Sequence, residues 1–181
     1  MAERLVILSD MWGSKKGLWI MSYLAYLQPY FDIDFYDCRQ LANIDVPINT
    51  QGNVYKAFKN GGMDLAVRHI LTKEDTPAHY LTFCAGGTIA WEAGLKGMPI
   101  KSLYAISPID LTEFSEKPDC PVTLIFGEDD EHVPDFLWAD KMGLKMEHIS
   151  KYGHGLYSDE KVIGKVCQDI LENFLKEKYQ S

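Results

Sequence analysis

The chain has 181 residues, of which 46% are hydrophobic and 24% are charged, and its formal net charge is −8. This length and composition predict one soluble domain, spanning residues 1–181, with a full hydrophobic core. The negative charge argues against a nucleic-acid-binding protein, because phosphate binding requires a basic surface.

The sequence also argues against export and membrane insertion. The apolar run at 5–8 follows Glu3 and Arg4 directly, without the basic segment and longer apolar stretch of a signal peptide, and no run is long enough to span a bilayer. The four cysteines lack CxxC or metal-like spacing. We therefore expect a cytoplasmic protein with reduced thiols, no metal and no cofactor. The sequence leaves open whether it is a monomer or a homodimer.

Short apolar runs alternate with segments of helical periodicity along the chain. The expected strands cover residues 4–9, 33–36, 79–83, 101–106, 122–126 and 145–149. The expected helices cover residues 16–28, 63–71, 87–95, 136–142 and 161–176, whereas 44–62 and 107–121 are expected to be loops. The first helix should bury an apolar side formed by Leu18, Met21, Tyr23, Leu24 and Leu27. This alternation predicts a parallel sheet covered on both faces, with its chemistry at the carboxyl ends of the strands.

The segment from Leu81 to Ala90 has the outline of a nucleophile elbow, a sharp turn between a strand and a helix. Cys84 lies at its centre, with Gly86 two residues after it and Thr82 at the position where the usual pattern has glycine. Small flanking residues are needed because the turn brings the strand and the helix close together. Such a turn directs the central side chain towards the first amides of the helix, which can bind an oxyanion.

Two further candidates follow later strands. The Asp129-Asp130 pair comes after the strand at 122–126, and His154 lies between two glycines after the last strand. Either aspartate could be the acid, although its spacing from Gly127 favours Asp130. His132 is the main rival to His154. The chain order is nucleophile, acid and base, the order found in α/β-hydrolase triads.

Together these motifs resemble those of a small member of the α/β-hydrolase superfamily. The elbow at 82–87 is similar to that of the dienelactone hydrolases, whose nucleophile is cysteine. The segment 127–134, the Gly-His pair at 153–154 and the Asp-x-Arg at 37–39 are similar to family segments, so the resemblance covers nearly the whole chain. It implies a three-layer α/β-hydrolase-like fold with a mostly parallel sheet of about six strands and little or no cap.

The proposed roles follow from general chemistry. Cys84 would attack as a thiolate, His154 would accept and return the proton, and Asp130 would orient the His154 ring. The oxyanion would be bound by the N–H of Ala85 and by an N–H from the loop after the first strand. In that loop Met11 is the first choice and Trp12 the second.

We therefore expect a hydrolase that acts on a small carboxylic ester, lactone or thioester through a covalent thioacyl intermediate. Trp12 and Tyr157, which lie beside the expected site loops, are expected to contact the substrate. Two alternatives remain open. The protein could be a non-catalytic α/β-hydrolase-like binding module, or a serine-type hydrolase in which cysteine replaces the nucleophile.

Overall fold

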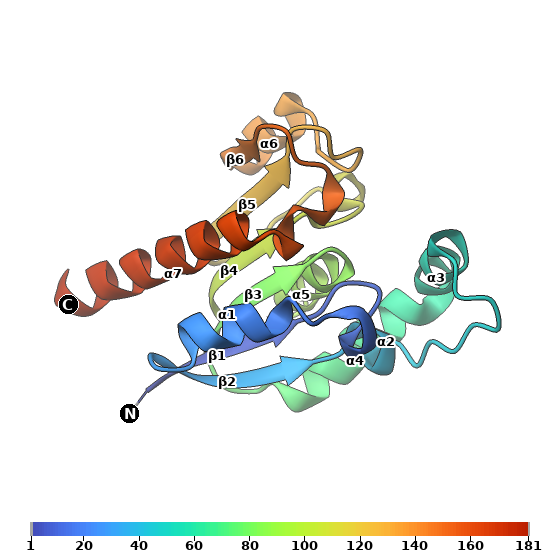
Figure 1. The fold of residues 1–181 in the computed structure, drawn as a ribbon, viewed down its shortest axis with the longest axis horizontal. Helices are drawn as coiled ribbons and strands as arrows, with labels where there is room; N and C mark the ends of the chain where they lie inside the picture. Colours follow the sequence, from blue (N-terminus) through green and yellow to red (C-terminus); the bar gives the residue numbers. More distant parts are fainter. Residues whose placement is uncertain (1, 181) are drawn as a thin grey trace.

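The structure is a computed structural model that describes residues 2–180, and its centre is a six-stranded sheet in which every neighbouring pair is parallel (Figure 1). The strand order is β2-β1-β3-β4-β5-β6. The strands are β1 (Glu3–Leu8), β2 (Phe31–Tyr36), β3 (Ala78–Phe83), β4 (Ile100–Ile106), β5 (Val122–Gly127) and β6 (Met146–Ile149). Strand β3 is buried along its whole length, as expected for a central strand with helices on both faces.

Helices cover both faces of this sheet. They are α1 (Ile20–Leu27), α4 (Met63–Lys73), α5 (Ala85–Leu95), α6 (Phe136–Met142) and α7 (Glu160–Gln180). Figure 1 shows α1 and α7 in front of the sheet and α4 and α5 behind it. On the α5 side, the rings of Trp91 and Trp138 lie 5.7 Å apart and join α5 to α6. This three-layer arrangement confirms the predicted fold class.

The first helix differs from the expectation in its start and in its buried side. Residues Ser14–Lys16 form a short 3-10 turn (η1), and the α-helix begins only at Ile20. The buried residues of the helix are Ile20, Tyr23 and Leu27, whereas Leu18 and Met21 are 86% and 62% exposed. The prediction for these two residues was therefore wrong, because Leu18 precedes the helix and Met21 is rotated by about 100° from the buried stripe.

The expected loop at 44–62 contains regular structure. Helix α3 (Gln51–Ala57) continues into a kinked segment η2 (Phe58–Gly62), in which Asn60 and Gly61 have non-helical backbone angles, and a short helix α2 (Cys38–Leu41) precedes the region. The Asp37 and Thr50 side chains cap α2 and α3 by accepting hydrogen bonds from backbone amides. The expected loop at 107–121 contains a 3-10 turn, η3 (Leu111–Glu113), and the Tyr55 hydroxyl joins the two regions by donating to Asp110 at 2.9 Å.

The sheet and its helices enclose a hydrophobic core. Its largest fully buried side chains include Trp91, Tyr23, Tyr80, Phe58 and Phe83. Within residues 2–180, no helix combines the length and the apolar character that crossing a bilayer requires.

Candidate active site

Cys84 occupies a strained turn between β3 and α5. Its φ of 50° and ψ of −121° lie in a region that residues other than glycine rarely adopt. Two backbone hydrogen bonds, both 3.0 Å long, hold this turn. The Cys84 N–H donates to the carbonyl of Ile106 at the end of β4, and the Gly87 N–H donates to the Cys84 carbonyl. The Cys84 residue is 1% exposed. Cys84 thus lies in a strained turn between a strand and a helix, with its side chain almost completely covered.

The two residues flanking the elbow explain how this turn is accommodated. A Cβ atom on Gly86 would lie 2.5 Å from the Ser9 carbonyl oxygen, so only glycine allows α5 to approach the end of β1 this closely. Thr82 does not obstruct this contact, because its buried hydroxyl donates to the Tyr104 carbonyl on β4 at 3.0 Å. A threonine therefore fits the position where the usual pattern has glycine.

The acid and the base expected from the sequence lie in contact. The Nδ1 atom of His154 is 3.0 Å from Oδ2 and 3.1 Å from Oδ1 of Asp130. The Asp130 side chain is fully buried, and its Oδ1 also accepts a hydrogen bond from the His132 amide at 3.0 Å. Asp129 is exposed. Of the two aspartates, Asp130 is the one that contacts His154.

His132, the rival base, has a different position. Its ring centroid lies 5.1 Å from that of His154, and the hydrogen bond that it gives to Asp130 comes from its backbone. His154 begins a short 3-10 segment, η4 (His154–Ser158), after the last strand. The His154 ring is therefore the one oriented by the buried carboxylate.

The surroundings of His154 favour its protonated form. Burial lowers the pKa of His154, but Asp130 and Cys84 together outweigh burial and raise that pKa to about 10. Conversely, burial raises the pKa of Asp130, but His154 and the His132 amide outweigh it, so the pKa lies below its usual value. The other ring nitrogen of His154, Nε2, is buried and has no hydrogen-bond partner among residues 2–180. This atom is free to exchange a proton with a nearby nucleophile.

Ser107 is a site residue that the sequence reasoning missed. It follows β4 directly, has a φ of 49°, and carries a buried hydroxyl with no hydrogen-bond partner in the described part of the chain. Ser107 is also among the groups that lower the pKa of Asp130. Its position immediately after a strand, at the carboxyl edge of the sheet, was the available sequence signal.

The loop after β1 is fixed by a buried carboxylate. Asp10 accepts hydrogen bonds from the Trp12 amide through Oδ1 and from the Tyr157 hydroxyl through Oδ2, each at 3.0 Å. The Trp12 amide is thus occupied, whereas the amides of Met11 and Ala85 donate no hydrogen bond within residues 2–180. Of the two expected oxyanion donors in this loop, Met11 is the one whose N–H is unoccupied.

Tyr157 and Trp12, the expected substrate contacts, differ in accessibility. Tyr157 is 5% exposed, and its ring packs against Trp19 and Phe83 with centroids 4.8 Å and 5.4 Å away. The Tyr157 hydroxyl donates to Asp10. The Tyr157 ring lies beside the His154 ring, with the two ring centroids 6.2 Å apart. Trp12 is partly exposed and lines an open cleft.

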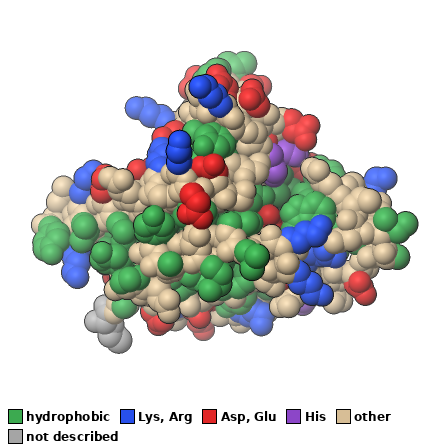
Figure 2. Space-filling view, viewed as in Figure 1, with side chains coloured by type: hydrophobic (Ala, Val, Ile, Leu, Met, Phe, Trp, Pro, Cys, Tyr) green, Lys and Arg blue, Asp and Glu red, His purple; other side chains and the backbone are tan. Residues whose placement is uncertain are grey.

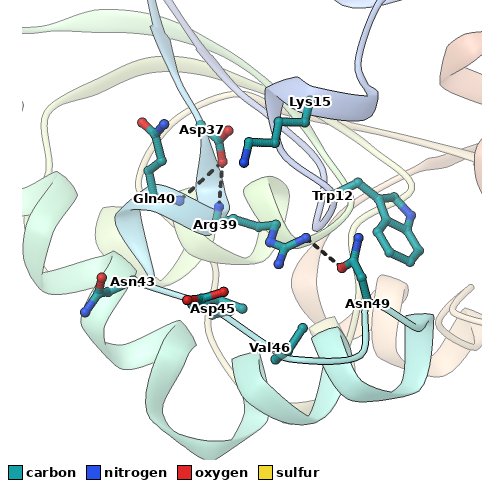
Figure 3. Close-up of a pocket in the computed structure, with 10 residues that line it drawn as sticks. Trp12, Lys15, Asp37, Arg39, Gln40, Asn43, Asp45, Val46 and Asn49 are labelled. Atoms are coloured by element: carbon teal, nitrogen blue, oxygen red, sulfur yellow. Dashed lines mark hydrogen bonds between the residues drawn. The ribbon is translucent and has the colours of Figure 1, made fainter.

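This cleft, which we call the Trp12 cleft, has a volume of about 520 Å³ (Figure 3). Besides Trp12, the residues lining it include Lys15, Asp37, Arg39, Asp45 and Asn49, and Cys84 is not among them. Figure 2 shows, on the face of the molecule turned towards the viewer, a hollow with histidine side chains on one side and lysine or arginine side chains on the other. Within residues 2–180, no group of three histidine, cysteine or acidic side chains could hold a metal ion.

Comparison with known proteins places the fold. Neither protein-family models nor curated proteins give a match. Among solved structures, a candidate α/β-superfamily hydrolase from Xanthomonas campestris pv. campestris has a TM-score of 0.69 at 14% identity, covering 94% of this chain and 99% of its own. A candidate dienelactone hydrolase from Klebsiella pneumoniae has a TM-score of 0.68 at 15% identity, covering 94% and 85%.

A third similar structure is Est1E from Butyrivibrio proteoclasticus with bound ferulic acid. Its TM-score is 0.61 at 17% identity, and the match covers 97% of this chain and 89% of Est1E. Together with the parallel sheet and its two helical layers, these similarities show that the chain has the α/β-hydrolase fold.

Proposed function

We propose that the protein hydrolyses a small carboxylic ester, lactone or thioester with Cys84 as nucleophile, His154 as base and Asp130 as the residue that orients His154. One observation carries this proposal. Asp130 binds Nδ1 of His154, while Nε2 is buried without a partner and Cys84 is close enough to raise the pKa of the ring. A carboxylate, an imidazole and a nucleophile at an elbow are the parts of a hydrolytic triad.

In the first half of the reaction, Nε2 of His154 holds the proton that the Cys84 thiol has lost, which leaves the sulfur as a thiolate beside a charged imidazole. The sulfur then attacks the substrate carbonyl carbon and forms a C–S bond, and the carbonyl electron pair moves to oxygen. The N–H groups of Ala85 and Met11 would stabilise this oxyanion, since both are unoccupied. When the oxyanion collapses, the bond to the leaving alcohol or thiol breaks, and His154 donates its proton to that group.

In the second half, water hydrolyses the thioacyl enzyme. The water oxygen attacks the thioester carbonyl carbon while His154 accepts a proton from that water. A second oxyanion then forms beside the same two backbone N–H groups. Collapse breaks the C–S bond, releases the carboxylic acid and restores the Cys84 thiolate beside the charged imidazole. Asp130 stabilises the charged imidazole in both halves, which agrees with the raised pKa of His154.

The proteins of similar fold support the choice of substrate class. One is a candidate dienelactone hydrolase, and Est1E binds ferulic acid, a carboxylic acid of the kind that ester hydrolysis releases. The partly exposed Trp12 side chain and the Tyr157 ring would contact the acyl or alcohol part of the substrate.

The direct test is hydrolysis of p-nitrophenyl acetate by the wild-type protein, Cys84→Ala and the control Cys120→Ala. Cys84→Ala should lose at least about a hundredfold in kcat/KM, because removing a triad nucleophile removes the covalent route. Cys120→Ala should retain wild-type activity, since Cys120 lies outside the site. Mass spectrometry of the rapidly quenched wild-type protein should find an acetyl group on Cys84. Equal turnover by wild type and Cys84→Ala would remove Cys84 from the mechanism.

A second candidate function rests on the 1% exposure of Cys84. A covered thiol is compatible with an α/β-hydrolase-like binding module that does not turn over its ligand. Alkylation of the folded protein by iodoacetamide, with the modified cysteines mapped by mass spectrometry, separates the two. A binding module predicts no modification of Cys84, whereas the proposed enzyme predicts that Cys84 reacts faster than the half-buried Cys120.

The third reading, a serine-type hydrolase in which cysteine replaces the nucleophile, is tested by Cys84→Ser. Higher kcat/KM in Cys84→Ser than in the wild type would favour that reading. Lower activity in the serine variant would support cysteine as the working nucleophile, because His154 is already arranged around a thiol.

A further inference from the structure

The Trp12 cleft contains two cationic side chains that no carboxylate neutralises by an ion pair. Lys15, from the 3-10 turn after β1, and Arg39, from α2, both line it, and Figure 3 shows the Lys15 side chain extending towards Asp37 and the Arg39 side chain towards Asn49. Neither forms an ion pair with an acidic side chain within residues 2–180. Arg39 makes one side-chain hydrogen bond, from Nη1 to Asn49 Oδ1 at 2.8 Å. Because a guanidinium carries five N–H donors, most of its capacity is unused.

Two carboxylates, Asp37 and Asp45, also line the cleft. Asp37 is occupied by capping, since it accepts hydrogen bonds from the Ser14 amide and hydroxyl and from the amides of Arg39 and Gln40. Asp45 makes no ion pair with either cation, and in Figure 3 it lies on the opposite side of the Arg39 head group from Lys15. The cleft is thus lined by two cations and two carboxylates, with neither cation in an ion pair within residues 2–180.

Trp12 connects this cleft to the candidate active site. It follows Met11, whose amide is a proposed oxyanion donor, and its own amide is fixed by Asp10. Lys16, which is not among the lining residues, places its Nζ atom 4.4 Å from the centre of the Trp12 ring. A ligand in the cleft would therefore lie beside the loop that carries the proposed oxyanion donor.

We propose that the Trp12 cleft binds a carboxylate or phosphate group of the substrate through Arg39 and Lys15, so that the natural substrate is an ester or thioester with a second, anionic end. This inference about substrate class rests on the proposed function, but anion binding in the cleft does not require turnover. Arg39 presents a planar set of donors to two oxygens of the anion, and Lys15 supplies a compact second charge. The Trp12 ring covers the chain that links the anion to the scissile bond.

The binding test uses calorimetric titration with glutarate and with inorganic phosphate as probes. Wild-type protein should bind at least one of them, and the variant Lys15→Met/Arg39→Gln should bind it about tenfold more weakly or not at all. The double variant Lys141→Met/Arg68→Gln is the matched control, because it removes the same charges from exposed positions outside the cleft. Asp45→Asn should strengthen binding, since it removes a negative charge from the lining.

The two probes distinguish the two sources of the anion. Tighter binding of glutarate indicates a carboxylate on the substrate, and tighter binding of phosphate indicates a phosphate. Absence of binding by either probe would overturn the proposal. Binding that is unchanged in Lys15→Met/Arg39→Gln would also overturn it, because the anion would then sit elsewhere. Circular dichroism of each variant shows whether it has folded.

Kinetics tests the link to the substrate. We compare hydrolysis of p-nitrophenyl butyrate, which is neutral, with that of mono-p-nitrophenyl glutarate, which has an anionic end. In Lys15→Met/Arg39→Gln, KM for the glutarate ester should rise about tenfold while KM for the butyrate ester stays unchanged. Equal effects on both esters would contradict substrate recognition by these residues. If neither ester is hydrolysed but glutarate still binds, the proposed activity fails while the anion site stands.

Discussion

At the scale of single residues, the charge of Asp130 controls the protonation of His154. The Asp130 carboxylate lies 3.0 Å from Nδ1 and is fully buried, so little solvent screens it. Burial alone lowers the pKa of His154, and the carboxylate helps to raise it to about 10. Asp130→Asn should therefore lower this pKa, because the neutral amide no longer stabilises the imidazolium. Titration of the His154 ring signals by NMR from neutral to alkaline pH measures the shift.

Asp129→Asn is the matched control for this prediction. It removes the same charge from the neighbouring position, but Asp129 is exposed and the bonds to His154 come from Asp130. Asp129→Asn should leave the His154 titration close to that of the wild type. If the two variants shift His154 equally, general electrostatics would explain the raised pKa, and Asp130 would lose its special role as the orienting group.

The residues of the proposed triad were accessible to sequence reasoning because they have local signatures. Cys84 follows an apolar strand and precedes Gly86 by two residues, and His154 lies between two glycines. The contact between Asp10 and Tyr157 had no such signature, because the residues are 147 positions apart and meet only through the packing of the loop after β1 against η4. The sequence already favoured Met11 over Trp12 as oxyanion donor, and the local hydrogen bond from the Trp12 amide to Asp10 leaves the Met11 amide as the unoccupied one of the two.

At the scale of elements, the close approach of α5 to β1 sets the position of Cys84. The space at Gly86 admits no side chain, since an added Cβ would lie 2.5 Å from the Ser9 carbonyl oxygen and 2.9 Å from Leu8 atoms. Gly86→Ala should push α5 away from the sheet and lower the free energy of unfolding by about 1–3 kcal/mol. It should also reduce kcat/KM, because Cys84 and the Ala85 amide move with the helix. Urea denaturation and the p-nitrophenyl acetate assay measure the two effects.

Gly164→Ala serves as the control for that substitution. Gly164 lies inside α7, and an added Cβ would meet nothing within 4 Å. The same chemical change should here raise the free energy of unfolding by about 0.5–1 kcal/mol, because alanine favours the helix over the unfolded chain. A stabilising Gly86→Ala, or no difference between the two variants, would contradict the tight contact between α5 and β1.

The helices that the sequence analysis missed show where local patterns fail. Helix α3 contains Gly52 and Asn53, both poor helix formers, so its periodicity is weak and the region was expected to be a loop. The capping residues Thr50 and Asp37 were the available signals. The long helices with regular apolar spacing were found, and the exact limits of α6 were predicted correctly.

At the scale of the whole molecule, the parallel sheet brings the candidate site together. Cys84 follows β3, Ser107 follows β4, and Asp130 follows β5, so their loops all lie at the carboxyl edge. Parallel strands direct all these ends the same way. The alternation of strands and helices was therefore enough to predict that Cys84 and Asp130 lie at one edge of the sheet, whereas the Trp12 cleft depends on side-chain positions that no pattern encodes.

The single hydrophobic core predicts cooperative unfolding of the whole chain. One contiguous cluster of buried residues extends from Leu5 in β1 to Ile170 in α7, and α1 packs beside α7 on one face of the sheet. Because no element has a separate core, far-UV circular dichroism and tryptophan fluorescence should report the same urea midpoint. Gly164→Ala should shift both curves together, although it lies in the last helix. Two separate transitions, with one probe unfolding first, would mean that the chain contains more than one folding unit and would contradict the single domain expected for residues 1–181.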